Sequence, residues 1–168
     1  MKFNKKLLAA TLLTVSGFAA ISSANAATDE GAFDVNLEVT EICEVTSASG
    51  TQDINLGSFA AGVDVTEGSS GTDISVNCSN TTGYSIGLLG SGVLTDSVST
   101  NTVAYSLLKE TGGAVWGNTG TDLVTGKGTG MATNQAKTHT VFASLAAGST
   151  DNLIAGTYTD TVAVTVTY

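Results

Sequence analysis

Residues 33–40 read Phe-Asp-Val-Asn-Leu-Glu-Val-Thr, with an apolar side chain at every odd position and a polar one at every even position. Successive side chains of an extended strand point to opposite faces, so this pattern predicts one strand with an apolar and a polar face. The apolar face consists of Phe33, Val35, Leu37 and Val39. It needs a hydrophobic groove, and the pattern leaves open whether that groove belongs to the same molecule or to the next one.

The segment upstream of this strand has the three parts of a secretory signal peptide. They are a basic start, a mostly apolar run and a small-x-small cleavage site: Lys2, Lys5 and Lys6, residues 7–21, and Ala24-Asn25-Ala26. The alternative is a membrane helix, but the apolar run is short, rich in small residues and ends in the cleavage site. We therefore expect residues 1–26 to be removed during export, which leaves Ala27 as the first mature residue.

The mature chain, residues 27–168, has a length that suits one domain with one core. It contains three lysines, no arginine and all fifteen acids, so three minus fifteen gives a formal charge of −12. Nucleic acids and anionic lipids need a basic surface, so neither is an expected partner, and we expect no membrane insertion after signal cleavage.

Glycine, serine and threonine are abundant, proline is absent, and short alternating runs recur along the chain. These features predict an all-β domain with about eight strands, of the immunoglobulin-like β-sandwich type. The expected strands or alternating runs are residues 42–45, 53–59, 72–78, 84–88, 102–109, 114–116, 123–131, 138–145 and 156–168. Residues 47–52 and 80–83 are expected turns, and residues 60–71, 90–101 and 146–154 are expected loops.

Cys43 and Cys78 are the only cysteines. An exported chain meets an oxidising compartment, so we expect them to form a disulfide. Closing a loop of about 36 residues contributes roughly 3–4 kcal/mol on the chain-entropy model. Since His139 is the only histidine and no Cys-x-x-Cys spacing occurs, we expect no metal site and no cofactor.

The expected last strand carries Val162, Val164, Val166 and Tyr168 at alternate positions. A strand at the edge of a sheet must be covered or paired, or it recruits another chain, and residues 33–40 are the candidate to fill that place. Burying the four apolar side chains of residues 33–39 contributes roughly 6–12 kcal/mol before entropy is deducted. The alternative is that these residues pair within their own chain and give a closed monomer.

A third hypothesis, from a different functional class, is a secreted enzyme. No Gly-x-Ser-x-Gly motif is present, and His139 is expected to be a solvated strand residue rather than a general base. Glu41 and Glu44 lack the spacing of a calcium loop, and residues 126–130 lack the Gly-Lys-Ser/Thr run of a phosphate loop. Trp116 is expected in the core, with an exposed contact patch as the alternative. We therefore expect no enzymatic activity.

Several short motifs also occur in the order and spacing of a known family. They are Cys43, residues 54–59 (Ile-Asn-Leu-Gly-Ser-Phe), 74–78 (Ile-Ser-Val-Asn-Cys), 103–107 (Val-Ala-Tyr-Ser-Leu), 115–117 (Val-Trp-Gly), 126–130 (Gly-Lys-Gly-Thr-Gly) and 155–168 (Ala-Gly-Thr-Tyr-Thr-Asp-Thr-Val-Ala-Val-Thr-Val-Thr-Tyr). Together they resemble the spore coat protein U domain, which is the pilin domain of archaic chaperone–usher pili. The resemblance covers residues 31–168.

The resemblance implies an incomplete immunoglobulin-like sandwich that a donor strand from a neighbouring subunit completes. It implies residues 27–41 as the donor segment, with Phe33, Val35, Leu37 and Val39 inserted, and residues 42–168 as the pilin domain. It also implies a C-terminal strand that lines the acceptor groove and is read by the chaperone; its residues would be Val162, Val164, Val166 and Tyr168. A disulfide, here Cys43–Cys78, is a further family feature.

The favoured hypothesis is therefore a structural subunit of an archaic chaperone–usher pilus, polymerised by donor-strand exchange and supporting adhesion and biofilm formation. The expected partners are other pilus subunits, a periplasmic chaperone and an outer-membrane usher, and the expected location is the cell surface. The sequence shows one domain, which fits a shaft or minor subunit better than a two-domain tip adhesin. The alternative function is a self-contained exported coat or surface protein that does not polymerise.

Overall fold

The computed structural model describes residues 28–46, 53–65 and 70–168. The expected signal peptide (residues 1–26), the expected turn at residues 47–52 and part of the expected loop at residues 60–71 lie outside the described residues. The chain divides into two units, Met1–Leu37 and Glu38–Tyr168. The second unit contains all the strands of the described residues.

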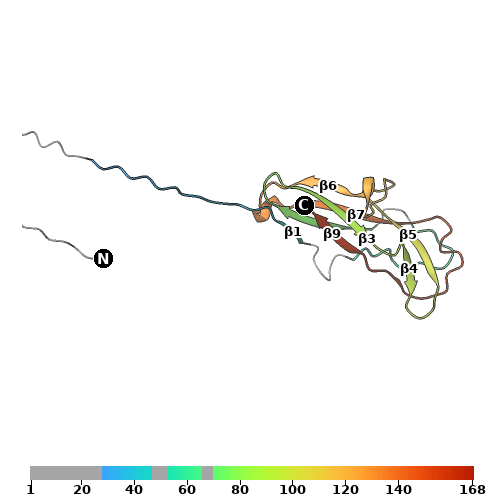
Figure 1. Ribbon diagram of the computed structural model, residues 1–168. Coiled ribbons are helices and arrows are strands. Elements are labelled where there is room, and N and C mark those ends of the chain that lie inside the picture. Colours follow the sequence, from blue (N-terminus) through green and yellow to red (C-terminus); the bar gives the residue numbers. More distant parts are fainter. Residues whose placement is uncertain (1–27, 47–52, 66–69) are drawn as a thin grey trace, which may run out of the picture. The chain divides into compact units, whose positions relative to one another are not determined.

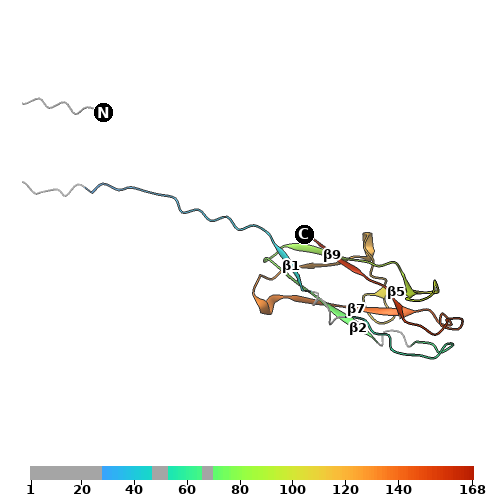
Figure 2. The ribbon, with the colours of Figure 1, turned by 90° about the horizontal axis from the view of Figure 1, so that it is seen from below.

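The domain is an all-β sandwich of two antiparallel sheets (Figures 1 and 2). Its strands are β1 (Cys43–Thr46), β2 (Gly71–Cys78), β3 (Gly83–Leu89), β4 (Val93–Asp96), β5 (Thr102–Leu108), β6 (Val124–Lys127), β7 (Lys137–Leu145), β8 (Tyr158–Thr159) and β9 (Ala163–Thr167). One sheet has the order β1-β2-β7-β5-β4-β8 and the other has the order β6-β3-β9. Figure 2 shows β9 in a different layer from β2 and β7.

The core forms where the alternating patterns of facing strands meet. Ile74 and Val76 of β2 and Tyr84, Ile86 and Leu88 of β3 are all buried. Their neighbours on each strand point to the outer face, because the side-chain period of a strand is two. The all-β sandwich predicted from these patterns is confirmed.

Trp116 also belongs to the core: it is 2 % exposed, and its Nε1 donates a hydrogen bond of 3.0 Å to the Ile86 carbonyl. The short strand predicted at residues 114–116 is wrong, because this stretch makes one isolated bridge between Val115 and Leu108. The backbone at residues 114–116 places the Trp116 indole in the core. A buried indole needs an acceptor for its N–H, which the Ile86 carbonyl supplies.

Three further predictions of strands and loops were wrong. The loop expected at residues 90–101 contains β4, which pairs with both β5 and β8. The single strand expected at residues 156–168 is broken into β8 and β9, which lie in different sheets. Residues 53–59 form no strand, although Ile54 and Leu56 are half-buried and pack against the core.

The predicted disulfide is present between Cys43 of β1 and Cys78 of β2, which face each other in the strand register. Beside it, Ile42 accepts a hydrogen bond of 2.9 Å from the Ser79 amide and donates one of 3.0 Å to the Ser79 hydroxyl. These contacts fix Ile42 and Cys43 to β2 and to Ser79. We call this end of the sandwich, where the C-terminus also lies (Figures 1 and 2), the disulfide end.

Replacing both Cys43 and Cys78 by alanine should lower the free energy of unfolding by about 3–4 kcal/mol, because the unfolded chain regains the freedom of a long loop. Part of that loss comes from the buried Cys78 side chain. Urea unfolding of the oxidised, reduced and double-variant chains measures the change. A loss under 1 kcal/mol in both the reduced and the double-variant chain would contradict this role.

Candidate functional site

The most unusual element of the sandwich is β9. Its residues pair with β3 in a continuous antiparallel register from Ala163↔Leu89 to Thr167↔Ser85, and none of the described strands pairs with its other edge. An unpaired strand edge presents a row of free backbone N–H and C=O groups. Val162, Val164 and Val166 are half-buried and pack against the core, so this edge is apolar as well as unpaired.

An open groove of about 1050 Å³ lies along this edge. One wall contains Val162 and Val164, and the other is the extended segment at residues 53–61, with Ile54 and Leu56. The floor consists of side chains from both sheets: Ile74, Leu88, Leu107, Val141 and Ala143. The groove therefore opens directly onto the hydrophobic core, at the place where a further strand of the three-stranded sheet would lie.

The chain crosses from one sheet to the other between β8 and β9, and Asp160 fixes this crossing. Its Oδ2 accepts a hydrogen bond of 2.6 Å from the Tyr105 hydroxyl and one of 2.9 Å from the Ser91 amide. Burial alone would raise the pKa of Asp160, but these hydrogen bonds hold it below its ordinary value. Burial and the hydrogen bond to Asp160 raise the pKa of the Tyr105 hydroxyl, so the pair stays phenol and carboxylate at neutral pH.

The opposite end of the sandwich, which we call the loop end, is closed by contacts between loops. Gly62 donates a backbone hydrogen bond to Thr150, and Ser97 donates one to Thr157. Asp96 is buried and accepts hydrogen bonds from the backbone amides of Val98 and Ser99. Hydrogen bonds, chiefly those to Ser99, lower the pKa of its carboxyl group. The groove thus extends from the fixed loop end to the level of Val164 in β9.

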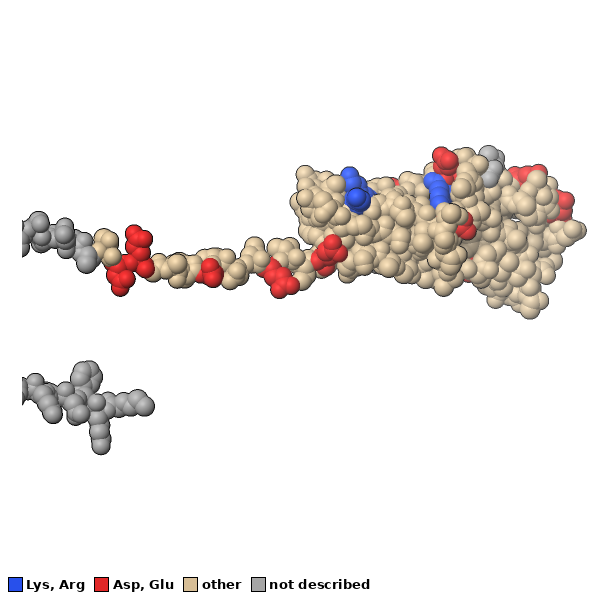
Figure 3. Space-filling view, turned by 45° about the horizontal axis from the view of Figure 1, so that its top comes forward, with Lys and Arg blue, Asp and Glu red and all other residues tan. Residues whose placement is uncertain are grey.

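The N-terminal segment at residues 28–42 contains no helix or strand, and neither sheet includes the alternating stretch at residues 33–40. Its four apolar side chains are highly exposed: Phe33 87 %, Val35 84 %, Leu37 88 % and Val39 78 %. Isolated exposed apolar residues are ordinary, but four at strand spacing form a continuous apolar stripe. The same segment carries acidic residues and no basic one (Figure 3).

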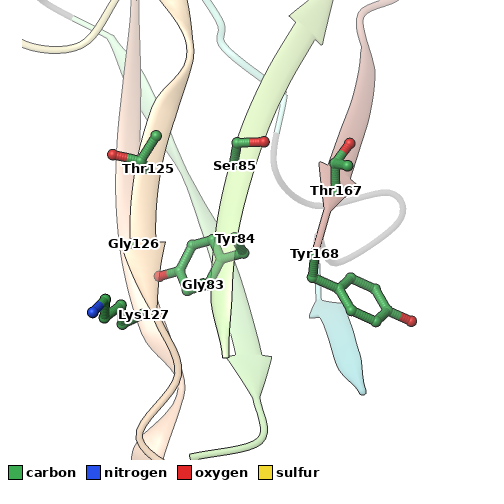
Figure 4. Close-up of a pocket in the computed structure, with 8 residues that line it drawn as sticks. All are labelled: Gly83, Tyr84, Ser85, Thr125, Gly126, Lys127, Thr167 and Tyr168. Atoms are coloured by element: carbon green, nitrogen blue, oxygen red, sulfur yellow. The ribbon is translucent and has the colours of Figure 1, made fainter. Parts of the chain in front are cut away.

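A second, shallow hollow of about 580 Å³ lies on the outer face of the three-stranded sheet at the disulfide end. Thr125, Ser85 and Thr167 form a row across β6, β3 and β9, and Lys127 and Tyr168 stand beside it (Figure 4). Tyr168 is 57 % exposed. It lines this hollow rather than the wall of the groove, unlike Val162 and Val164.

His139 differs from its prediction. It is half-buried rather than solvated, its Nε2 lies 2.9 Å from the Tyr84 hydroxyl, and its ring stands edge-on to Tyr84 and Trp116. Burial lowers the pKa of the His139 imidazole, because the charged form is poorly solvated there. The prediction failed because both ring partners come from other strands or loops, far away in the sequence.

The described residues do not bring three His, Cys, Asp or Glu side chains together where they could hold a metal ion. In the same part of the chain, no helix has the length and apolar character needed to cross a membrane.

Comparison with known families gives a match over residues 29–165 to the Spore Coat Protein U domain. The chain belongs to this family. A search of curated proteins finds no match. Among solved structures, the chain is similar to a chain of the CsuC–CsuE chaperone–tip adhesion subunit pre-assembly complex from archaic chaperone–usher Csu pili of Acinetobacter baumannii, with a TM-score of 0.53 and 18 % identity. The similarity covers 77 % of this chain and 40 % of that chain, and it concerns the fold.

In this Spore Coat Protein U domain, the residues predicted to line the acceptor groove lie in three places. Val162 and Val164 line the groove, Val166 packs against the core beside it, and Tyr168 lies at the second hollow. The predicted donor residues form one exposed stripe. Sequence reasoning missed Tyr105 and Asp160, because a hydrogen bond between residues 55 positions apart leaves no local pattern.

The Spore Coat Protein U domain should lose stability as the pH falls from 7.5 to 5, because His139 has a folded-state pKa below its unfolded value near 6.5. The contribution of neutral His139 to the free energy of unfolding is fully present above the pKa of the unfolded state, and it is lost when the imidazole is protonated. Asp96 and Asp160 also have lowered pKa values, so their contributions to stability are lost only at a lower pH. Urea midpoints measured across this range should fall more steeply for the wild type than for His139→Gln, and parallel curves would contradict the assignment.

Proposed function

We propose that this chain is a structural subunit of an archaic chaperone–usher pilus and that it polymerises by donor-strand exchange. The donor is the exposed stripe Phe33, Val35, Leu37 and Val39 of one copy, and the acceptor is the groove beside β9 of the next. The observation that carries the proposal is the free edge of β9 above an open part of the core. An added strand would satisfy both the backbone groups and the apolar surface there.

The two partners match in length and spacing. The donor stripe spans six residue steps, from Phe33 to Val39, or about 20 Å of strand. The acceptor edge spans the same number, from Val162 to Tyr168. All described strand pairs are antiparallel, and an antiparallel donor gives the register Phe33 opposite Tyr168, Val35 opposite Val166, Leu37 opposite Val164 and Val39 opposite Val162.

The length of the connector favours insertion into a neighbour over insertion into the same chain. Ile42 is anchored to Ser79 at the disulfide end, so Val39 can lie no more than about 11 Å from it. In the antiparallel register Val39 sits opposite Val162, near the loop end and about 20 Å along β9 from Tyr168. A connector of two residues, Thr40 and Glu41, is too short for that path within one molecule.

The energy of insertion is large enough to hold a fibre together. Burial of the four donor side chains contributes roughly 6–12 kcal/mol before entropy is deducted, which is comparable with the stability of a whole domain. A subunit with an empty groove exposes part of its core and needs a protecting partner before assembly. A periplasmic chaperone would serve this purpose, and an outer-membrane usher would pass the subunits on.

The family and the fold both support these partners. The similar solved structure is described as a chaperone–tip adhesion subunit pre-assembly complex from archaic chaperone–usher pili. Export through the periplasm agrees with the signal peptide predicted at residues 1–26 and with the disulfide. We therefore place the assembled protein on the cell surface as a pilus component without enzymatic activity, where it supports adhesion and biofilm formation.

Leu37→Asp should abolish fibre growth, because it places a charge in the apolar groove of the acceptor. The chain, expressed with its chaperone and usher, is run on a denaturing gel without boiling. The wild type should give a ladder that collapses to monomer on boiling, and Leu37→Asp should give chaperone-bound monomer alone. Asn36→Asp introduces the same group on the polar face and should keep the ladder.

Two results would count against the proposal. A wild-type chain that runs as monomer in both lanes indicates the alternative function, a self-contained exported coat or surface protein. A Leu37→Asp chain that assembles as well as Asn36→Asp shows that residues 33–39 are not the donor.

A further inference from the structure

We propose that the hollow around Lys127 and Tyr168 binds the acidic N-terminal flank, residues 28–32, of the neighbouring subunit, as a second contact beyond the donor strand. This inference rests on the proposed function, because the flank reaches the hollow only when the donor is inserted. The bound group is a short acidic peptide, Thr-Asp-Glu-Gly-Ala. Its recognition uses one cation and a row of hydroxyl groups.

The direction of the donor brings the flank to this place. In the antiparallel register Phe33 lies opposite Tyr168, so residues 28–32 leave the groove at the disulfide end. Thr167 and Tyr168, at the end of the acceptor edge, also line the hollow. The flank therefore emerges beside the hollow.

Charge favours the contact. The flank carries Asp29 and Glu30, and the only charged residue lining the hollow is Lys127. Lys127 is exposed and has no partner among the described residues, whereas Lys109 already donates hydrogen bonds to the carbonyls of Thr121 and Leu123. Of the three lysines of the mature chain, Lys127 alone lines the hollow.

The flank is also long enough. Lys127 lies on β6, which would be three strand spacings, about 14 Å, from a donor paired with β9. Asp29 stands four residues before Phe33, an extended reach of about 13 Å, and the lysine side chain adds to this reach. Gly31 gives the flank the freedom to turn from the line of the donor strand toward β6.

The surface of the hollow suits a peptide. Thr125, Ser85 and Thr167 present hydroxyl groups in one row that runs from the donor edge to β6, two residues along β6 from Lys127 (Figure 4). Each hydroxyl can donate to a carboxylate or accept from a backbone amide. Gly83 has no side chain to fill the space between Lys127 and Ser85. The contact is solvent-exposed and electrostatic, so it should weaken with added salt.

The first test is zero-length carbodiimide cross-linking of assembled wild-type fibres, followed by digestion and mass spectrometry. Lys127 should be joined to Asp29 or Glu30, and Lys109 should not. Fibres in which the flank is linked to Lys137 or to no lysine would overturn the contact and leave donor-strand exchange intact. A chain that forms no ladder would overturn the proposed function and this inference together.

The second test is charge reversal in the full chain, measured as the rate at which the unboiled ladder dissociates on heating at low salt. Lys127→Glu should dissociate about two- to five-fold faster than the wild type, and the difference should vanish at high salt. Adding Asp29→Lys and Glu30→Lys to Lys127→Glu should restore the rate. Lys137→Glu is the matched control, and equal rates for the two reversals would overturn the proposal.

Discussion

One edge of β9 is bonded to β3, and the other faces an open groove with no described strand beside it. Backbone N–H and C=O groups next to a hydrophobic core are costly unless they are paired. The half-buried side chains of Val162, Val164 and Val166 add apolar surface at the same place. The domain therefore folds around a missing strand, and the same chain carries a segment with the matching pattern outside both sheets.

The rest of the fold keeps this groove open and in shape. The disulfide and the Ile42–Ser79 hydrogen bonds fix the point where the N-terminal segment joins the domain, and Asp160 with Tyr105 fixes the crossing where β9 begins. A polar link thus holds the start of the acceptor edge, while its middle is apolar. Under the proposed function, the short connector after residues 33–39 makes insertion into a neighbouring molecule, rather than into the same one, the physically accessible arrangement.

Local sequence patterns were sufficient for much of this structure. The alternation in residues 72–78 correctly predicted β2, and the two cysteines correctly predicted the disulfide. The break between β8 and β9 was missed, although Asp160 interrupts the apolar side of the alternation, because only its distant partner Tyr105 explains the crossing. β4 was missed because its neighbours are rich in glycine and serine, and its pairing with β5 and β8 depends on tertiary contacts. The groove itself arises from strand order, which alternation does not encode.

The most direct test of the central claim is amide hydrogen exchange along β9 in the isolated mature chain and in assembled fibres. The amides of Ala163–Thr167 that point away from β3 should exchange quickly in the isolated chain and slowly in the fibre, because only the fibre supplies a strand to accept their hydrogen bonds. Amides in the middle of β7, bonded on both sides, should be protected in both states. Protection of the whole of β9 in the isolated chain, or no gain of protection in the fibre, would contradict the account.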